Sequence, residues 1–334
     1  MNAWVMGFVA PVEQFLGRVC SKIPFLSIAE CITAFAIISF LVFLVNTVVS
    51  LIRTRTFLFL FKRIGYLVCA LAWLWAAFCW MWNAVYYIPS LTQRCGLSAT
   101  PHSVEELANV TAYFAHQAGT LASQVPRDAN GHFEKNLEDY FQNGRSVYDV
   151  IAQEFPCLQM ESVQAKPLLC SPLQSALGFT GVYFPFTGEA NINTDSPACL
   201  IPATIAHEMA HQRMIAPEQE ANFAGIAACI TSDNLVFQYS GYLMGLIHLS
   251  NALYSVSPSY WQTIVDTFFT SELRTDWNDN NAYWAERAST VEEAAETVYD
   301  SFLKGNQQDM GIQSYGACVD LLVSYVLPKL KTES

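Results

Sequence analysis

The stretch Cys31–Ile52, CITAFAIISFLVFLVNTVVSLI, carries no charged side chain over 22 residues. A second stretch, Ile64–Ile88, IGYLVCALAWLWAAFCWMWNAVYYI, carries none over 25 residues. As a helix that rises about 1.5 Å per residue, each is long enough to cross the roughly 30 Å hydrocarbon core of a bilayer. A core helix of a globular protein rarely stays uncharged over that length. The two stretches therefore predict a pair of transmembrane helices within residues 28–88.

The loop between the two stretches gives their orientation. It contains four basic residues and no acidic one: Arg53, Arg55, Lys62 and Arg63. Short basic loops stay in the cytoplasm, so residues 89–334 and the C-terminus are expected outside the cell membrane. The aromatic residues at the end of the second stretch, Trp80, Trp82, Tyr86 and Tyr87, are typical of a membrane interface. Residues 1–27, with two prolines and short apolar runs, predict an interfacial amphipathic segment on the bilayer.

The composition of the 334 residues excludes several classes of protein. Only 14% of the residues are charged and 52% are hydrophobic, which argues against a disordered or freely soluble chain. The net charge of −12 argues against a nucleic-acid partner. Ten cysteines without a CxxC pair do not form a cysteine metal cluster, and the six beyond the spans allow 15 disulfide pairings. Cys229 lies in an apolar run and is expected to be a buried thiol.

Residues 89–334 predict a mainly α domain with one small β element. Val182–Phe186 and Ala190–Asn193 have strand composition and flank a turn. After Pro202 the pattern is helical almost to the end. The predicted helices there cover 202–212, 217–231, 234–252, 258–269, 281–304 and 312–327.

The motif His207-Glu208-Met209-Ala210-His211 carries the chemistry. Two histidines at positions i and i+4 share one helix face and can bind one Zn²⁺. Glu208 between them is the candidate general base, which takes a proton from the attacking water. The alternative is a chance pair of surface histidines, but the chain has only six histidines and the flanking residues are apolar.

A catalytic zinc site needs a third protein ligand, and Glu218 follows shortly after the motif. Asn222, one turn later, is expected to accept a hydrogen bond from a ligand histidine. Gly225 shares this face and would let the second helix approach the first closely. Glu220 is the alternative ligand on the opposite face, and both acids could instead only favour the helix dipole.

These motifs, HExxH followed by Glu218-Gln219-Glu220-Ala221-Asn222, resemble those of the gluzincin metallopeptidases, which often have Asp at the last position. More closely, the chain resembles an uncharacterised bacterial domain-of-unknown-function family of two-span membrane proteins with this zinc motif. The stretches that carry this resemblance are residues 183–191, 207–223, 239–242 and 303–315. The resemblance implies a helical, gluzincin-like metallopeptidase domain behind the two spans.

Other candidate parts of the site are weaker. The predicted strand before the motif could pair with an extended peptide, and Glu189 beside it is expected to be a solvated acid rather than a cleft residue. The candidate donors to the oxyanion of the reaction are Tyr239, Tyr242, His248 and Tyr315. Each of these four is individually expected to be a packing residue.

The sequence thus predicts a membrane-anchored zinc metallopeptidase whose partners are the lipid bilayer and a peptide or protein substrate. Because the motif lies outside both spans, the expected substrates are envelope, extracellular or juxtamembrane proteins. Two alternatives remain open. One is a non-catalytic membrane protein with a structural or ligand-binding zinc site, and the other is a hydrolase that acts on a non-peptide bond.

Overall fold

The structure is a computed structural model that describes residues 1–54, 57–97, 102–288, 290–305 and 315–333. Arg55 of the basic loop, the start of the predicted helix 312–327, much of the family stretch 303–315 and the side chain of Tyr315 lie outside this part. The described chain is mainly helical, with a small three-stranded sheet. The predicted fold class is confirmed at that level.

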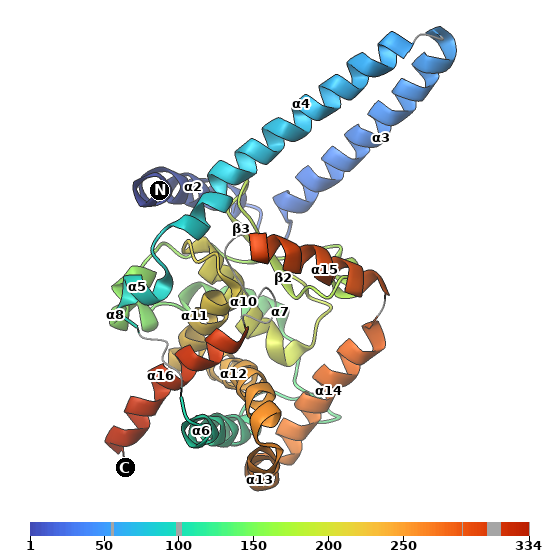
Figure 1. Cartoon of the computed structure of the whole chain (residues 1–334). Helices are drawn as coiled ribbons and strands as arrows, with labels where there is room; N and C mark the ends of the chain where they lie inside the picture. The colour runs from blue at the N-terminus through green and yellow to red at the C-terminus, as the bar shows by residue number, and fades with distance from the viewer. Residues whose placement is uncertain (55–56, 98–101, 289, 306–314, 334) are drawn as a thin grey trace.

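The part that holds the two candidate spans comes first in the chain and contains α1 (Asn2–Trp4), η1 (Val5–Val9), α2 (Ala10–Cys20), α3 (Ile28–Thr54), α4 (Phe57–Met81) and η2 (Asn83–Tyr87). Helices α3 and α4 form a hairpin that projects from the rest of the molecule (Figure 1). Both are long and apolar enough to cross a membrane, over Ile28–Arg53 and Leu58–Met81. Their large apolar side chains are exposed, among them Phe35, Phe61 and Trp73 at more than 70%. Such an apolar surface is suited to lipid and not to water.

The elements between the second apolar helix and the β2–β3 hairpin come next. They are α5 (Leu91–Cys95), α6 (Val104–Ala122), α7 (Leu137–Asn143), η3 (Gly144–Ser146), α8 (Ile151–Glu154), η4 (Pro156–Leu158), β1 (Lys166–Pro167) and α9 (Ser171–Ala176). The strands β2 (Gly181–Phe184) and β3 (Glu189–Ile192) form the predicted hairpin, in antiparallel register from Gly181 opposite Ile192 to Phe184 opposite Glu189. Strand β1 pairs in parallel with the other side of β3. The order β1-β3-β2 therefore leaves β2 at an edge of the sheet.

The helical core follows, with η5 (Ala198–Leu200), α10 (Ile201–Gln212), α11 (Glu218–Thr231), α12 (Leu235–Val256), α13 (Pro258–Phe268), α14 (Ser271–Arg287), α15 (Thr290–Gly305) and α16 (Tyr315–Glu333). Helix α11 lies against α10, α12 and α16, and nearly all its residues are buried. Helix α10 is buried even more completely, because it also packs against β2 and β3. Cys229 in this core is a free, fully buried thiol, as predicted.

Two sequence-based expectations about the elements were wrong. The single helix predicted over 281–304 is two helices, α14 and α15, because the chain turns to an extended conformation at Ala288. Glu189 is not a solvated acid: it is only 1% exposed and forms an ion pair with Lys166, Nζ to Oε1 2.6 Å. Its carboxylate also accepts hydrogen bonds from the backbone N–H groups of Ile28 and Ala29 at the start of α3.

Candidate metal centre

Three side chains from α10 and α11 meet at one point. His207 and His211 lie one turn apart on α10, and Glu218 opens α11. The Nε2 atom of His207 is 3.2 Å from Oε2 of Glu218, and Nε2 of His211 is 3.7 Å from Oε1. One potential ligand atom from each residue lies within 4.8 Å of the others, so this group could hold a metal ion. Two imidazoles and one carboxylate are a donor set that suits zinc.

Hydrogen bonding prepares His211 for this role. Its Nδ1 atom lies 2.7 Å from the carbonyl oxygen of Ile215, which can only accept, so Nδ1 carries the proton. The lone pair is then on Nε2, which faces Glu218. The Nδ1 atom of His207 is buried without a hydrogen-bond partner among the residues that the structure describes. Burial lowers the pKa of His207, but Glu218, Glu208 and, to a smaller extent, Asn222 raise it above its usual value. The hydrogen bond from a ligand histidine to Asn222 stays a prediction.

The pKa values of the two carboxyl groups at the site are shifted in opposite directions. Burial raises the pKa of Glu208 to about 8, and its Oε2 atom has no hydrogen-bond partner in the described part of the chain. For Glu218, burial alone would raise the pKa, but His211 and His207 together lower it to about 2. Glu218 is therefore an anion facing the histidines, whereas Glu208 is a carboxyl group suited to accept and give up a proton near neutral pH.

The close approach of β2 to Glu208 depends on a glycine. A Cβ atom on Gly181 would lie 2.5 Å from Oε1 and 2.7 Å from Cγ of Glu208. Strand β2, which lies at an edge of the sheet, thus passes directly beside the candidate base. A second glycine permits the approach of the two ligand helices, because a Cβ atom on Gly225 of α11 would lie 2.8 Å from the backbone nitrogen of His207.

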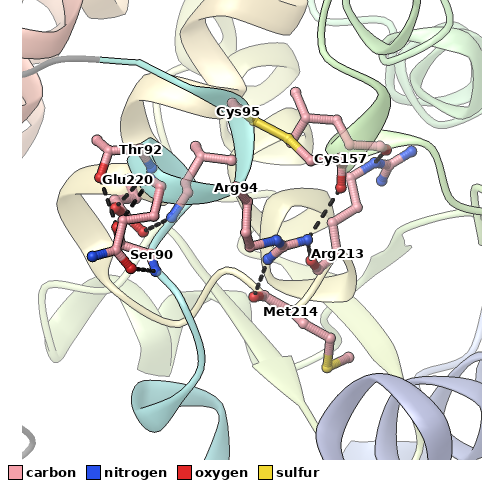
Figure 2. The surroundings of a disulfide bond; sticks show 11 residues. Ser90, Thr92, Arg94, Cys95, Cys157, Arg213, Met214 and Glu220 are labelled. Atoms are coloured by element: carbon pink, nitrogen blue, oxygen red, sulfur yellow. Dashed lines mark hydrogen bonds between the residues drawn. A yellow bond between two sulfur atoms is a disulfide. The ribbon is translucent and has the colours of Figure 1, made fainter. Parts of the chain in front are cut away.

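Glu220, the alternative ligand, has a different task. Its carboxylate accepts hydrogen bonds from the N–H groups of Leu91 and Thr92, at 2.8 and 3.4 Å, and so caps the start of α5 (Figure 2). Those bonds turn it away from the histidines. The geometry therefore favours Glu218 over Glu220 as the third ligand.

Helix α5 in turn fixes the short link between the ligand helices. The guanidinium of Arg94 donates to the carbonyl oxygens of Met214 at 3.0 Å and Arg213 at 3.4 Å, as Figure 2 shows for Met214. A disulfide joins Cys95 to Cys157, and the other four cysteines beyond the apolar helices are free thiols. Met214 has a positive φ of 56°, an unusual conformation for a residue with a side chain. These contacts hold the tight turn that brings Glu218 back to the histidines.

A cavity of about 1140 Å³ opens onto the metal-ligand group. Its walls are β2 with the residues before it, α10, α11, α15 and the end of α4 with η2. Tyr299 of α15 lines this cavity, and its hydroxyl donates a hydrogen bond to Oε1 of Glu218. The sequence reasoning missed Tyr299, because no local pattern shows that α15 folds back over the site.

Three of the four predicted oxyanion donors, Tyr239, Tyr242 and His248, do not line this cavity. The hydroxyl of Tyr239 is buried and donates to Asp276, and that of Tyr242 lies 3.3 Å from the hydroxyl of Tyr113. Burial lowers the pKa of His248 to about 4. The side chain of Tyr315 lies outside the described part of the chain. Among the described residues, Tyr299 is thus better placed than any of these candidates to donate a hydrogen bond at the ligand group.

Comparison with known proteins gives a family and no more. Residues 4–323 match the family described as "Protein of unknown function (DUF3810)". No curated protein and no solved structure matches the chain. Because the match spans almost the entire chain, from the N-terminal helices to the last core helix, the protein belongs to the DUF3810 family.

Proposed function

We propose that the protein is a membrane-anchored, zinc-dependent metallopeptidase that hydrolyses peptide bonds of envelope or extracellular substrates. The observation that carries the proposal is the position of Glu208. Its buried carboxyl group contacts the edge strand β2 at Gly181 and lines the same cavity as the His207-His211-Glu218 group. A base, a candidate metal site and a strand edge that can bind an extended peptide thus meet in one cavity.

The residues divide the chemistry among them. His207, His211 and Glu218 would hold the metal ion, which supplies Lewis acidity at the scissile carbonyl. Glu208 takes a proton from the attacking water and later delivers it to the leaving amine, a task that suits its raised pKa. The backbone of β2 would align the peptide by main-chain hydrogen bonds. Tyr299 is near enough to the ligand group to donate a hydrogen bond to the developing oxyanion.

The disulfide and the two apolar helices support the proposed location. Disulfides form and persist in oxidising compartments outside the cytoplasm. A disulfide between Cys95 and Cys157 therefore agrees with an extracytoplasmic domain, as does the basic loop between α3 and α4. Labelling of single cysteines in intact cells, one in the 53–63 loop and one near Lys331, tests this topology. Labelling of Lys331→Cys only after permeabilisation would contradict it.

Two variants test the metal and the chemistry separately. We expect the purified wild type to bind one zinc ion and His207→Ala to lose it, as measured by elemental analysis. Glu208→Gln should keep the zinc and lose turnover, because an amide cannot take up a proton. A closed, non-catalytic zinc site would instead bind zinc in both the wild type and Glu208→Gln with no hydrolysis in either. Hydrolysis of ester or amide probes without peptide cleavage would favour the non-peptide alternative.

A further inference from the structure

The cavity at the metal-ligand group continues to the end of the second transmembrane helix. Phe78 in the last turn of α4, Trp82 directly after it and Tyr86 in η2 all line the cavity. The ring centre of Trp82 is 5.7 Å from that of His211 and 5.0 Å from that of Tyr183 in β2. The side chain of Trp82, at the point where the chain leaves the second apolar helix, therefore lies next to a candidate metal ligand.

The length of α4 places this point at the bilayer surface. Its 25 residues span about 37 Å, against about 30 Å for the hydrocarbon core, so its last turn emerges into the headgroup region. The N-terminal segment lies at the same level, because Nε1 of Trp4 donates to the carbonyl oxygen of Trp80 at 3.0 Å. Helix α2 buries Gly17 against Gly188 of the 185–188 turn and exposes Phe15 at 57%, as expected of an interfacial helix.

Strand β2 has a defined direction relative to this surface. Its first residue, Gly181, lies beside Glu208. Its last residue, Phe184, leads into the 185–188 turn, where a Cβ atom on Gly188 would contact the backbone of Glu13 in α2. Strand β2 therefore runs from the interior of the domain toward the bilayer. A peptide on its free edge, in the more stable antiparallel arrangement, runs the opposite way, with its N-terminal side at the bilayer.

We propose, on the basis of the metallopeptidase function above, that the substrates are proteins anchored in the membrane on the N-terminal side of the cleaved bond. The anchor is an N-terminal transmembrane helix or lipid, and the extended segment just outside the bilayer enters the cavity past Phe78, Trp82 and Tyr86. Cleavage then releases the C-terminal part of the substrate from the membrane. The headgroup layer is thin, and an extended chain advances about 3.3 Å per residue, so the cut falls within about ten residues of the anchor.

The experiment uses the full-length protein in liposomes with zinc and a peptide library of ten randomised residues. The library is presented in three forms: with an N-terminal palmitoyl group, with a C-terminal palmitoyl-lysine, and without an anchor. Mass spectrometry measures the cut sites and rates, and Glu208→Gln is the control. We expect the N-anchored form to be cleaved at least about tenfold faster than the free form, because the membrane raises its effective concentration. It should also be cleaved faster than the C-anchored form, because that form would have to lie on β2 in the opposite direction. A 30-residue Gly/Ser spacer after the anchor should remove this advantage.

Each outcome decides one of the proposals. Equal cleavage of anchored and free peptides, at the same bonds, overturns the proposed substrate class and leaves the metallopeptidase function intact. Faster cleavage of the C-anchored form overturns the proposed direction of the substrate on β2. Absence of cleavage in all three forms, with zinc bound, overturns the metallopeptidase function itself.

Discussion

Replacement of Gly225 by alanine tests the packing that brings the two ligand helices together. The added Cβ atom would lie 2.8 Å from the backbone nitrogen and 3.0 Å from the Cα of His207, whereas ordinary contacts of such atoms begin at about 3.4 Å. The neighbouring atoms belong to the backbone, so no side-chain rotation relieves the clash. Helices α10 and α11 must therefore move apart by about 0.5 Å.

This displacement acts directly on the proposed metal site, because His207 lies on one helix and Glu218 on the other. Metal–ligand distances tolerate only about 0.2 Å of change. We therefore expect Gly225→Ala to lower the zinc affinity by about 10-fold to 100-fold, the range for changes just outside the ligands. The overpacking should also lower the free energy of unfolding by about 1–3 kcal/mol. Competition with a chromogenic chelator measures the affinity, and thermal unfolding measures the stability.

A matched control separates these two effects. A Cβ atom on Gly119 of α6 would lie 2.5 Å from the backbone oxygen of Phe268, a clash of the same kind far from the ligands. Gly119→Ala should lose comparable stability and keep its zinc affinity. Zinc affinity equal to that of the wild type in Gly225→Ala would refute the reasoning. A similar loss of affinity in Gly119→Ala would show that general destabilisation causes the effect.

Three further predictions concern the two acids of α11, the buried Glu13 and the disulfide. Glu218→Gln should weaken zinc binding strongly, whereas Glu220→Gln should mainly lower the melting temperature, because it releases the start of α5; chelator competition and thermal unfolding on both variants decide this. Burial raises the pKa of Glu13 to about 8, so the folded protein retains a proton that the unfolded chain releases above 4.5. The stability that this bound proton contributes is therefore lost as the pH rises from 4.5 to 8. Urea unfolding at a series of pH values measures this loss; Glu13→Gln should make the free energy of unfolding less dependent on pH in this range, and an unchanged dependence would contradict the prediction. The Cys95–Cys157 disulfide spans 62 residues, so Cys95→Ser with Cys157→Ser should lose about 4 kcal/mol of stability, and equal urea midpoints with and without the disulfide would contradict this.

Local patterns allowed much of the fold to be predicted. The two uncharged runs became the two candidate spans, and the strands on either side of the 185–188 turn lie within a residue or two of their predicted places. The spacing of His207 and His211 required only that residues 202–212 be helical. Helical periodicity also separated the faces of Glu218 and Glu220, and the structure directs only Glu218 toward the histidines.

Features that depend on distant parts of the chain could not be predicted in this way. Tyr299 reaches Glu218 across 81 positions, because α15 folds back over the cavity. Glu189 resembled a surface acid, since no residue near it in sequence indicates that Lys166 and the start of α3 surround it. The polar run of α14 lacks the apolar periodicity of an amphipathic helix, so its first half was missed. In each case the deciding contact is tertiary.

The buried ion pair of Lys166 and Glu189 connects the strands beside the candidate site to the start of α3. Glu189 accepts hydrogen bonds from the first N–H groups of α3, and Lys166 donates to the carbonyl oxygens of Cys20 and Leu26 before it. Lys166 is in β1 and Glu189 is in β3, the strand that pairs with β2 beside Glu208. Because unpairing a buried charge costs about 3–5 kcal/mol, this ion pair fixes the start of the candidate span α3 relative to the sheet. Strand β2 and the start of α3 are therefore held in a fixed position relative to each other, as the proposed cleavage close to a membrane anchor would require.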